Sequence, residues 1–385
     1  MTVAARGPIG RLAALLAPGG PNAPVPTTTN EWQPVLEAAS RHKLVPALWS
    51  ALQADDAVVA VPEQLARQWD PDAHGDIPVE LALASIHHHN VDHVTSMCRQ
   101  ASEILSALHA ENIRAVPLKG VDAIFAGRYP DPGARTMVDA DILIDPPEAG
   151  AAETVVYGLG YRSVPVPVSS HQLSPVVRPG QPGSVELHRA LTSERWAAIA
   201  DASEVLDRSR VGREGRRQAS RTDSATHLVA HAQLHDEAYL LWRLPLRAAH
   251  ETALLVSGAE EVDWDDVARA FCRVRRRRAL AAHLDLTAHL FGVPSPLRAG
   301  RVWGYRARAT VSLDRRPATL QLLDQVVFLP RALSSARMTE LYEATDRRSI
   351  HRARMRHVRR ALRRRLGSSG GGDGATGSLS PSPTE

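Results

Sequence analysis

Apolar residues recur at helical spacing in two long stretches of the chain. From about residue 31 to 110 they return every three or four positions, which predicts helices, one of them interrupted near Pro46. The stretch from Pro78 to His109 is predicted as one long helix that ends at Asn112. Helical spacing returns from about 222 to 345, where Asp263 is an expected N-cap.

Between these stretches, apolar and polar residues alternate in short runs that are typical of strands. The expected strands are 113–118, 136–144, 161–168 and 184–191, with a Gly/Pro-rich turn before the last. Helical turns are expected at 120–127 and from Pro146 to about Gly160. The predicted fold class is therefore α+β, with a mixed β-sheet core flanked by N- and C-terminal helical regions.

The pattern also predicts how the chain is divided. The segments are a loosely ordered N-terminus (1–30), an N-terminal helical region (31–110), a mixed core (111–220), a C-terminal helical domain (221–346), an arginine-rich helix (347–366) and a disordered tail (367–385). The first is rich in Gly, Pro and Thr, and the last in Gly, Ser and Pro, compositions that bury little apolar surface.

Composition narrows the class of protein without naming a function. The 385 residues are 44% hydrophobic and 23% charged, and the two cysteines, Cys98 and Cys272, are far apart. A disordered chain, a collagen-like chain and a disulfide scaffold are therefore excluded. No apolar run approaches the roughly 18–20 residues of a membrane helix, and the N-terminal LAALLA is too short for a signal peptide. We therefore expect a cytoplasmic protein without a transmembrane segment.

Positive charge is concentrated near the C-terminus. Residues 347–365 hold ten arginines and no acidic residue, whereas the net charge of the whole chain is only +4. This helix could contact a polyanion such as RNA, DNA or an anionic membrane surface. It could equally be a solvated helix, or one docked on the slightly acidic remainder of the chain. No aromatic residue interleaves with the arginines, so base stacking is not indicated.

Candidate chemistry centres on the run VDADILI. Asp139 and Asp141 are two residues apart on an expected strand, so they project from the same face. Adjacent carboxylates repel each other unless a cation lies between them, and Mg²⁺ prefers such oxygen ligands. Glu186 and His188 share a face of the strand 184–191. If the two strands are neighbours, Glu186 completes a three-carboxylate cluster that could hold two metal ions.

The turn upstream offers groups suited to phosphate. Gly120 lets backbone N–H groups approach a phosphate at a helix N-terminus, and Lys119 adds a positive charge. Arg135 could also face phosphate, or could pair with Asp131 or Asp139. His188 is favoured as a structural partner of the acids over a general base.

Three histidines form a second group of candidate functional residues. His227, His231 and His235 lie at four-residue steps and would line one face of a helix. Zinc binding would need a third ligand, so a helix-packing face or a face directed at the site is the preferred interpretation.

These motifs together resemble a known family. LKG, Tyr129 and Arg135, D-x-D in an apolar strand, and an E-L-H strand are similar to the pattern of uncharacterised bacterial nucleotidyltransferases, over roughly residues 31–296. The resemblance implies a nucleotidyltransferase fold for the core, Mg²⁺ dependence, and transfer of a nucleoside monophosphate from an NTP to an acceptor. It also implies that Asp139 and Asp141 bind metal, that Glu186 is the third acid, and that Lys119 and Gly120 belong to the nucleotide loop.

Two departures from the superfamily pattern leave alternatives open. Val121 stands where the loop usually has serine, and the third acid is glutamate instead of the commoner aspartate. The acceptor could be a small molecule, or it could be a tRNA or a protein, as for a toxin-type nucleotidyltransferase. A degenerate, non-catalytic nucleotide-binding or scaffold protein is the third alternative.

Overall fold

The described part of the chain falls into two units. The computed structural model describes residues 7–54, 78–165, 171–212, 216–297 and 301–316, and beyond these residues 318–319, 322, 333, 338, 346 and 348–356. Contacts within the chain define the units Met1–Pro317 and Ala318–Glu385. Residues 348–356 are helical, and they are the described part of the predicted arginine-rich helix. The rest of that helix, and the tail, lie outside the described residues.

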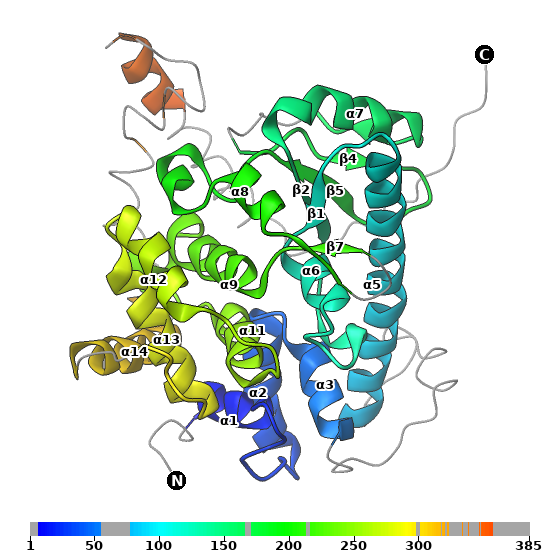
Figure 1. The fold of residues 1–385 in the computed structure, drawn as a ribbon. Helices are drawn as coiled ribbons and strands as arrows, with labels where there is room; N and C mark the ends of the chain where they lie inside the picture. Colours follow the sequence, from blue (N-terminus) through cyan, green and yellow to red (C-terminus); the bar gives the residue numbers. More distant parts are fainter. Residues whose placement is uncertain are drawn as a thin grey trace. The chain divides into compact units, whose positions relative to one another are not determined.

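A five-stranded mixed sheet lies within the first unit (Figure 1). Its order is β1-β2-β5-β4-β3, and the strands are β1 (Ala115–Pro117), β2 (Asp139–Ile144), β3 (Arg162–Ser163), β4 (Val176–Val177) and β5 (Ser184–His188). β2 and β5 run parallel, and the other neighbours run antiparallel. The α+β class with a mixed sheet is confirmed. Within the strand expected over 161–168, Arg162–Ser163 form β3, and residues 166–168 lie outside the described residues. β4 lies where a turn was expected.

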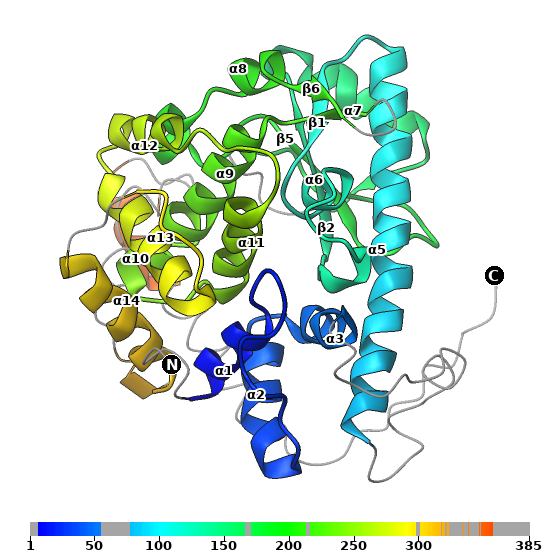
Figure 2. The ribbon, with the colours of Figure 1, turned by 60° about the horizontal axis from the view of Figure 1, so that its bottom comes forward.

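The two faces of β2 meet different helices, because side chains alternate along a strand. Ala140, Ile142 and Ile144 are fully buried in a cluster with the long helix α5 (Val79–Ala110). Leu143 points the other way, into a cluster with helices that follow the sheet. They include α8 (Ala202–Asp207), α9 (Arg221–Ala230), α12 (Trp264–Arg273) and α13 (Arg277–Phe291). Asp139 and Asp141 share the face of Leu143. The acidic pair therefore faces the C-terminal helices. Figure 2 shows β2 and the neighbouring helices α9 and α11.

The N-terminal helices share a third apolar core with helices from the other end of this unit. These are α1 (Pro8–Leu15), α2 (Thr29–Arg41) and α3 (Val45–Ala54), packed with α11 (Leu246–Ser257), α13 and α14 (Arg301–Asp314). Ile9, Leu12 and Leu15 of α1 are buried. Residues 1–6 lie outside the described residues, but within the segment expected to be loosely ordered, Pro8–Leu15 form a helix. A helix this short is not stable alone, and the distant helices that cover its apolar face stabilise it.

Three predicted helix boundaries are confirmed. α2 ends at Arg41 and α3 begins at Val45, which is the expected interruption near Pro46. Asn112 follows α5 with a φ of 58°, the left-handed conformation that often ends a helix. Asp263 accepts a hydrogen bond from the Asp266 N–H at 2.9 Å and caps α12. The other α-helices among the described residues of this unit are α6 (Lys119–Phe125), α7 (Ala149–Gly158) and α10 (Ala238–Leu241).

Gly183, directly before β5, lies where a side chain does not fit. Its φ is +71°, and an added Cβ would lie 2.9 Å from the Val138 carbonyl oxygen and 2.6 Å from Met97 Sδ. We expect Gly183→Ala to lower the free energy of unfolding by about 2–4 kcal/mol, from the backbone conformation and the displaced neighbours together.

Gly180→Ala is the matched control for this prediction. Gly180 has a φ of +76° but nothing within 4 Å of an added Cβ, so its variant should lose only about 1–2 kcal/mol. Urea denaturation of both variants measures the difference. Equal losses would show that the contact with Val138 and Met97 is unimportant.

Candidate active site

The parallel pairing of β2 and β5 brings the three predicted acids together. Asp141 lies opposite Glu186 in the register, and Asp139 lies opposite Ser184. Asp141 is 2% exposed, whereas Asp139 is half-buried and Glu186 is partly exposed. The sequence left open whether these strands are neighbours, and the structure shows that they are.

Asp141 is held by two positively charged or chargeable groups. Lys119 Nζ and His188 Nε2 each donate to Asp141 Oδ1 at 2.7 Å. Burial by itself would raise the pKa of Asp141, but the His188 hydrogen bond and the Lys119 charge outweigh it and hold the pKa far below its usual range. Conversely, burial would lower the pKa of His188, but its hydrogen bonds to Asp141 and Glu186 raise it. His188 thus lies where a partner of the acids is expected, and its chemical role stays a prediction.

Among the described residues, Asp139 has no such partners. In the described part of the chain it makes no hydrogen bond or ion pair. Burial and the neighbouring Asp141 charge raise its pKa. The charges of Lys119 and Arg247 offset these effects only in part, so the charged form of Asp139 stays disfavoured.

A cavity of about 260 Å³ lies between this face of the sheet and the C-terminal helices. On the sheet side it is lined by Lys119, Gly120, Asp139 and Asp141; the helical side includes His227 of α9, His231, and Arg247 and Glu251 of α11. Its size is just below the roughly 300–1,000 Å³ typical of small-molecule sites. Glu186 and His188 are not among the described residues that line it.

Arginines give the cavity a positive region. Arg135 is 6% exposed, and its Nε lies 3.2 Å from Glu251 Oε2, an ion pair without hydrogen-bond geometry. Neither Asp131 nor Asp139, the partners considered from sequence, forms this pair. Arg247 makes no hydrogen bond or ion pair with the described residues, and burial together with the charge of Arg135 lowers its pKa. Such crowding of positive charge favours a bound anion.

The first turn of α6 is more constrained than its sequence suggests. Lys119 has a φ of +48°, and backbone strain of this kind in a non-glycine residue is concentrated at functional sites. An added Cβ on Gly120 would lie 2.3 Å from Met137 Sδ. Glycine at this position therefore makes room for the Met137 side chain in the described structure. Its predicted approach to phosphate stays a prediction.

The predicted histidine face lies near the same cavity, but its helix changes type. α9 ends at Ala230, and His231–His235 forms a π-helical turn. His227 and His231 line the cavity. Burial lowers the pKa of His235, and that of the adjacent His171, to about 4. The preference for a face directed at the site agrees with this geometry for two of the three histidines.

Several residues of this site have no sequence signature. Arg247, Glu251 and Asp236 belong to no motif, and they reach the cavity only because the helices after the sheet pack over its acidic face. The same holds for Ser224, whose hydroxyl donates to Asp122 at 2.7 Å and connects α9 to α6. Apolar periodicity predicted these helices, but it did not predict the partner surface on which they dock.

Comparison with known proteins identifies the family. The profile described as "uncharacterised nucleotidyltransferase" matches residues 28–292, so the chain belongs to that family. A solved structure of the antibiotic-resistance factor ANT(2'')-Ia is similar at 18% identity and a TM-score of 0.34, over 49% of this chain and 96% of that one. No protein with a curated description matches the chain. Among the described residues, no helix has the length and apolarity needed to cross a membrane.

Proposed function

We propose that the protein is a Mg²⁺-dependent nucleotidyltransferase that transfers a nucleoside monophosphate from an NTP to the hydroxyl group of an acceptor. One observation carries this proposal: Asp139, Asp141 and Glu186 meet on two parallel strands beside a cavity with an arginine-rich wall. Membership of the nucleotidyltransferase family supports it.

The acidic cluster fits a hard divalent cation. Its donors are carboxylate oxygens, the ligands that Mg²⁺ prefers. Burial and the neighbouring Asp141 charge raise the pKa of Asp139, and a bound cation would favour its charged form. When bound, Mg²⁺ would neutralise the phosphates and the oxygen atoms that attack and leave. We assign Asp139, Asp141 and Glu186 as its ligands, with room for one or two ions.

The chain's own cations would bind the triphosphate. Arg135, Arg247 and Lys119 all line the cavity, and Arg247, which has no ion-pair partner among the described residues, is best placed to gain a phosphate partner. Lys119 Nζ donates a hydrogen bond to Asp141 in this structure. When an NTP binds, the same ammonium group could contact a phosphate.

Group transfer then needs a positioned acceptor. The acceptor oxygen would form a bond to the α-phosphorus as the bond to pyrophosphate breaks, and the hydroxyl proton would pass to Glu186 or to water. Glu186 is partly exposed and lies next to the buried His188, so it is suited to orient or deprotonate that hydroxyl. The acceptor is proposed only as a class, namely a small molecule, a tRNA or a protein.

Calorimetric titration of each NTP, with and without Mg²⁺, tests the proposal. We expect one or more NTPs to bind, at least tenfold more tightly with Mg²⁺ present. Glu111→Gln is the control variant, because Glu111 is an exposed carboxylate at the end of α5. Its NTP affinity, with and without Mg²⁺, should equal that of the wild type. Binding that is indifferent to Mg²⁺ would favour a non-catalytic nucleotide-binding protein, and no binding by the folded protein would refute the proposal.

A labelling experiment with the NTP found in this way then identifies the acceptor class. With the α-phosphate radiolabelled, label transferred to tRNA, to protein or to a small-molecule fraction separates the three classes. Release of pyrophosphate in step with labelling is expected for nucleotidyl transfer. Release of inorganic phosphate instead would show a different reaction.

A further inference from the structure

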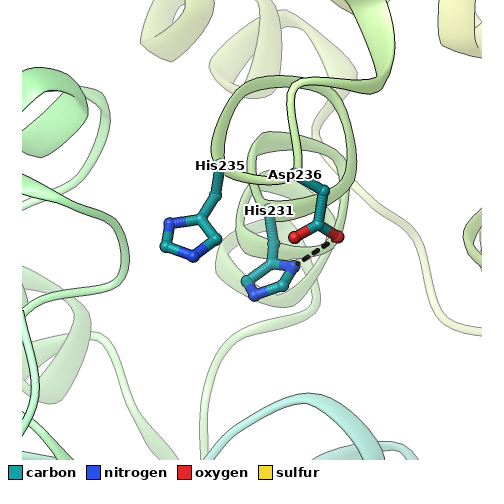
Figure 3. A group of neighbouring side chains, drawn as sticks. All are labelled: His231, His235 and Asp236. Atoms are coloured by element: carbon teal, nitrogen blue, oxygen red, sulfur yellow. Dashed lines mark ion pairs between the residues drawn. The ribbon is translucent and has the colours of Figure 1, made fainter. Parts of the chain in front are cut away.

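Three possible metal ligands converge at the π-helical turn beside the cavity. His231, His235 and Asp236 each offer a ligand atom, and these atoms all lie within 4.8 Å of one another. Figure 3 shows the three side chains projecting from the same side of the turn. They come from η6 (His231–His235) and the residue after it, whereas the carboxylate cluster lies on β2 and β5.

The π-helical geometry creates this convergence. The Asp236 N–H donates to the His231 carbonyl oxygen at 2.8 Å, a bond between residues five apart. This wider turn places Asp236 beside His231, with Asp236 Oδ2 3.2 Å from His231 Nδ1. In a regular α-helix, residues five apart lie well around the helix from each other. Single π-turns are frequent at functional sites.

We infer that His231, His235 and Asp236 bind a divalent transition-metal cation of the Zn²⁺ class. Two imidazoles and one carboxylate form a donor set typical of zinc sites that keep a coordination position open. Ligand atoms around tetrahedral zinc are roughly 3.4 Å apart for bonds of about 2.1 Å, so small side-chain rotations would close the site.

The surroundings of His235 support binding over simple packing. In the described part of the chain, the His235 ring makes no hydrogen bond. Its described contacts are ring contacts, stacked on His231 at 4.8 Å and edge-on to His171 at 5.0 Å. A half-buried imidazole without a hydrogen-bond partner has a lone pair available for a metal.

The site is open to the cavity. His231 and Asp236 line the cavity that Asp139 and Asp141 line from the sheet side. Three protein ligands leave a fourth position for water or for a donor atom of a molecule in the cavity. The inference does not depend on nucleotide binding, because it rests on the turn and its side chains alone.

Metal binding to the full chain without nucleotide tests this inference. After removal of metals, we expect equilibrium dialysis to show one tightly bound Zn²⁺ per chain, and Co²⁺ to give the visible absorption of a four-coordinate site. Bound Zn²⁺ should also raise the melting temperature. His235→Ala and Asp236→Asn should each weaken binding at least tenfold and abolish the thermal shift. Asp236 is exposed, so its variant should fold normally.

Two controls locate the metal. His289→Ala removes another half-buried helical histidine and should leave Zn²⁺ binding unchanged. Glu186→Gln disables the other candidate cluster, Asp141, Glu186 and His188, and should also leave it unchanged. Absence of stoichiometric Zn²⁺, or binding lost in Glu186→Gln but retained in His235→Ala, would overturn the inference. Because no NTP is present, neither result bears on the proposed transferase activity.

Discussion

Asp141→Asn is expected to lower the free energy of unfolding by about 3 kcal/mol, near the lower end of the range for removing one partner of a buried ion pair. The substitution leaves Lys119 Nζ and the buried His188 without the negative charge that both contact at 2.7 Å. The loss stays near the lower end because asparagine keeps one acceptor oxygen and the Lys119 side chain is 23% exposed.

The loss should depend on pH in a defined way. Asp141 has a lowered pKa in the fold, so its contribution is present above about pH 4 and disappears as the pH falls through the folded value. His188 has a raised pKa, so its contribution is present below about pH 6.5 and disappears as the pH rises through the folded value. The difference between wild type and variant should therefore be greatest between about pH 4 and 6.5.

Urea denaturation across this pH range measures the effect. Glu111→Gln, the exposed control, should match the wild type throughout. A loss below about 1 kcal/mol, or one that does not change with pH, would contradict the charged arrangement around Asp141.

Asp139→Asn is expected to separate function from stability. Its carboxylate makes no hydrogen bond or ion pair in the described chain, and burial next to Asp141 raises its pKa. The charged form is therefore disfavoured in the fold, and the neutral variant should be at least as stable as the wild type at pH 7. The same change removes one proposed metal ligand, so Mg²⁺-dependent NTP binding should weaken at least tenfold.

Paired measurements check this prediction. Calorimetry gives NTP affinity with and without Mg²⁺, and urea denaturation gives stability. Any stability advantage of the variant should diminish as the pH falls through the raised pKa of the wild-type carboxyl, which then becomes neutral as well. Unchanged affinity in a stable Asp139→Asn protein would remove Asp139 from the metal site.

Local features of the site were predictable because strand geometry has a period of two. That period alone puts Asp139 and Asp141 on one face and Ala140 on the other, as the structure shows. The three-acid cluster required β2 and β5 to be neighbours, and the sequence alone did not show whether they are. Arg135 shows the limit, because its partner Glu251 lies 116 residues away, whereas the acids considered from sequence lie within four residues of it.

The sequence by itself determined the α+β class, the main helices and the acidic pair, since each follows from spacing within a few residues. The tertiary structure decided which charges meet: Glu186 opposite Asp141, Lys119 and His188 on one carboxylate oxygen, and Arg247 in the cavity wall. It also decided that α1 is buried and that a π-turn joins Asp236 to the histidines. These contacts depend on how separate elements pack, and packing energies depend on surfaces that lie far apart in the chain.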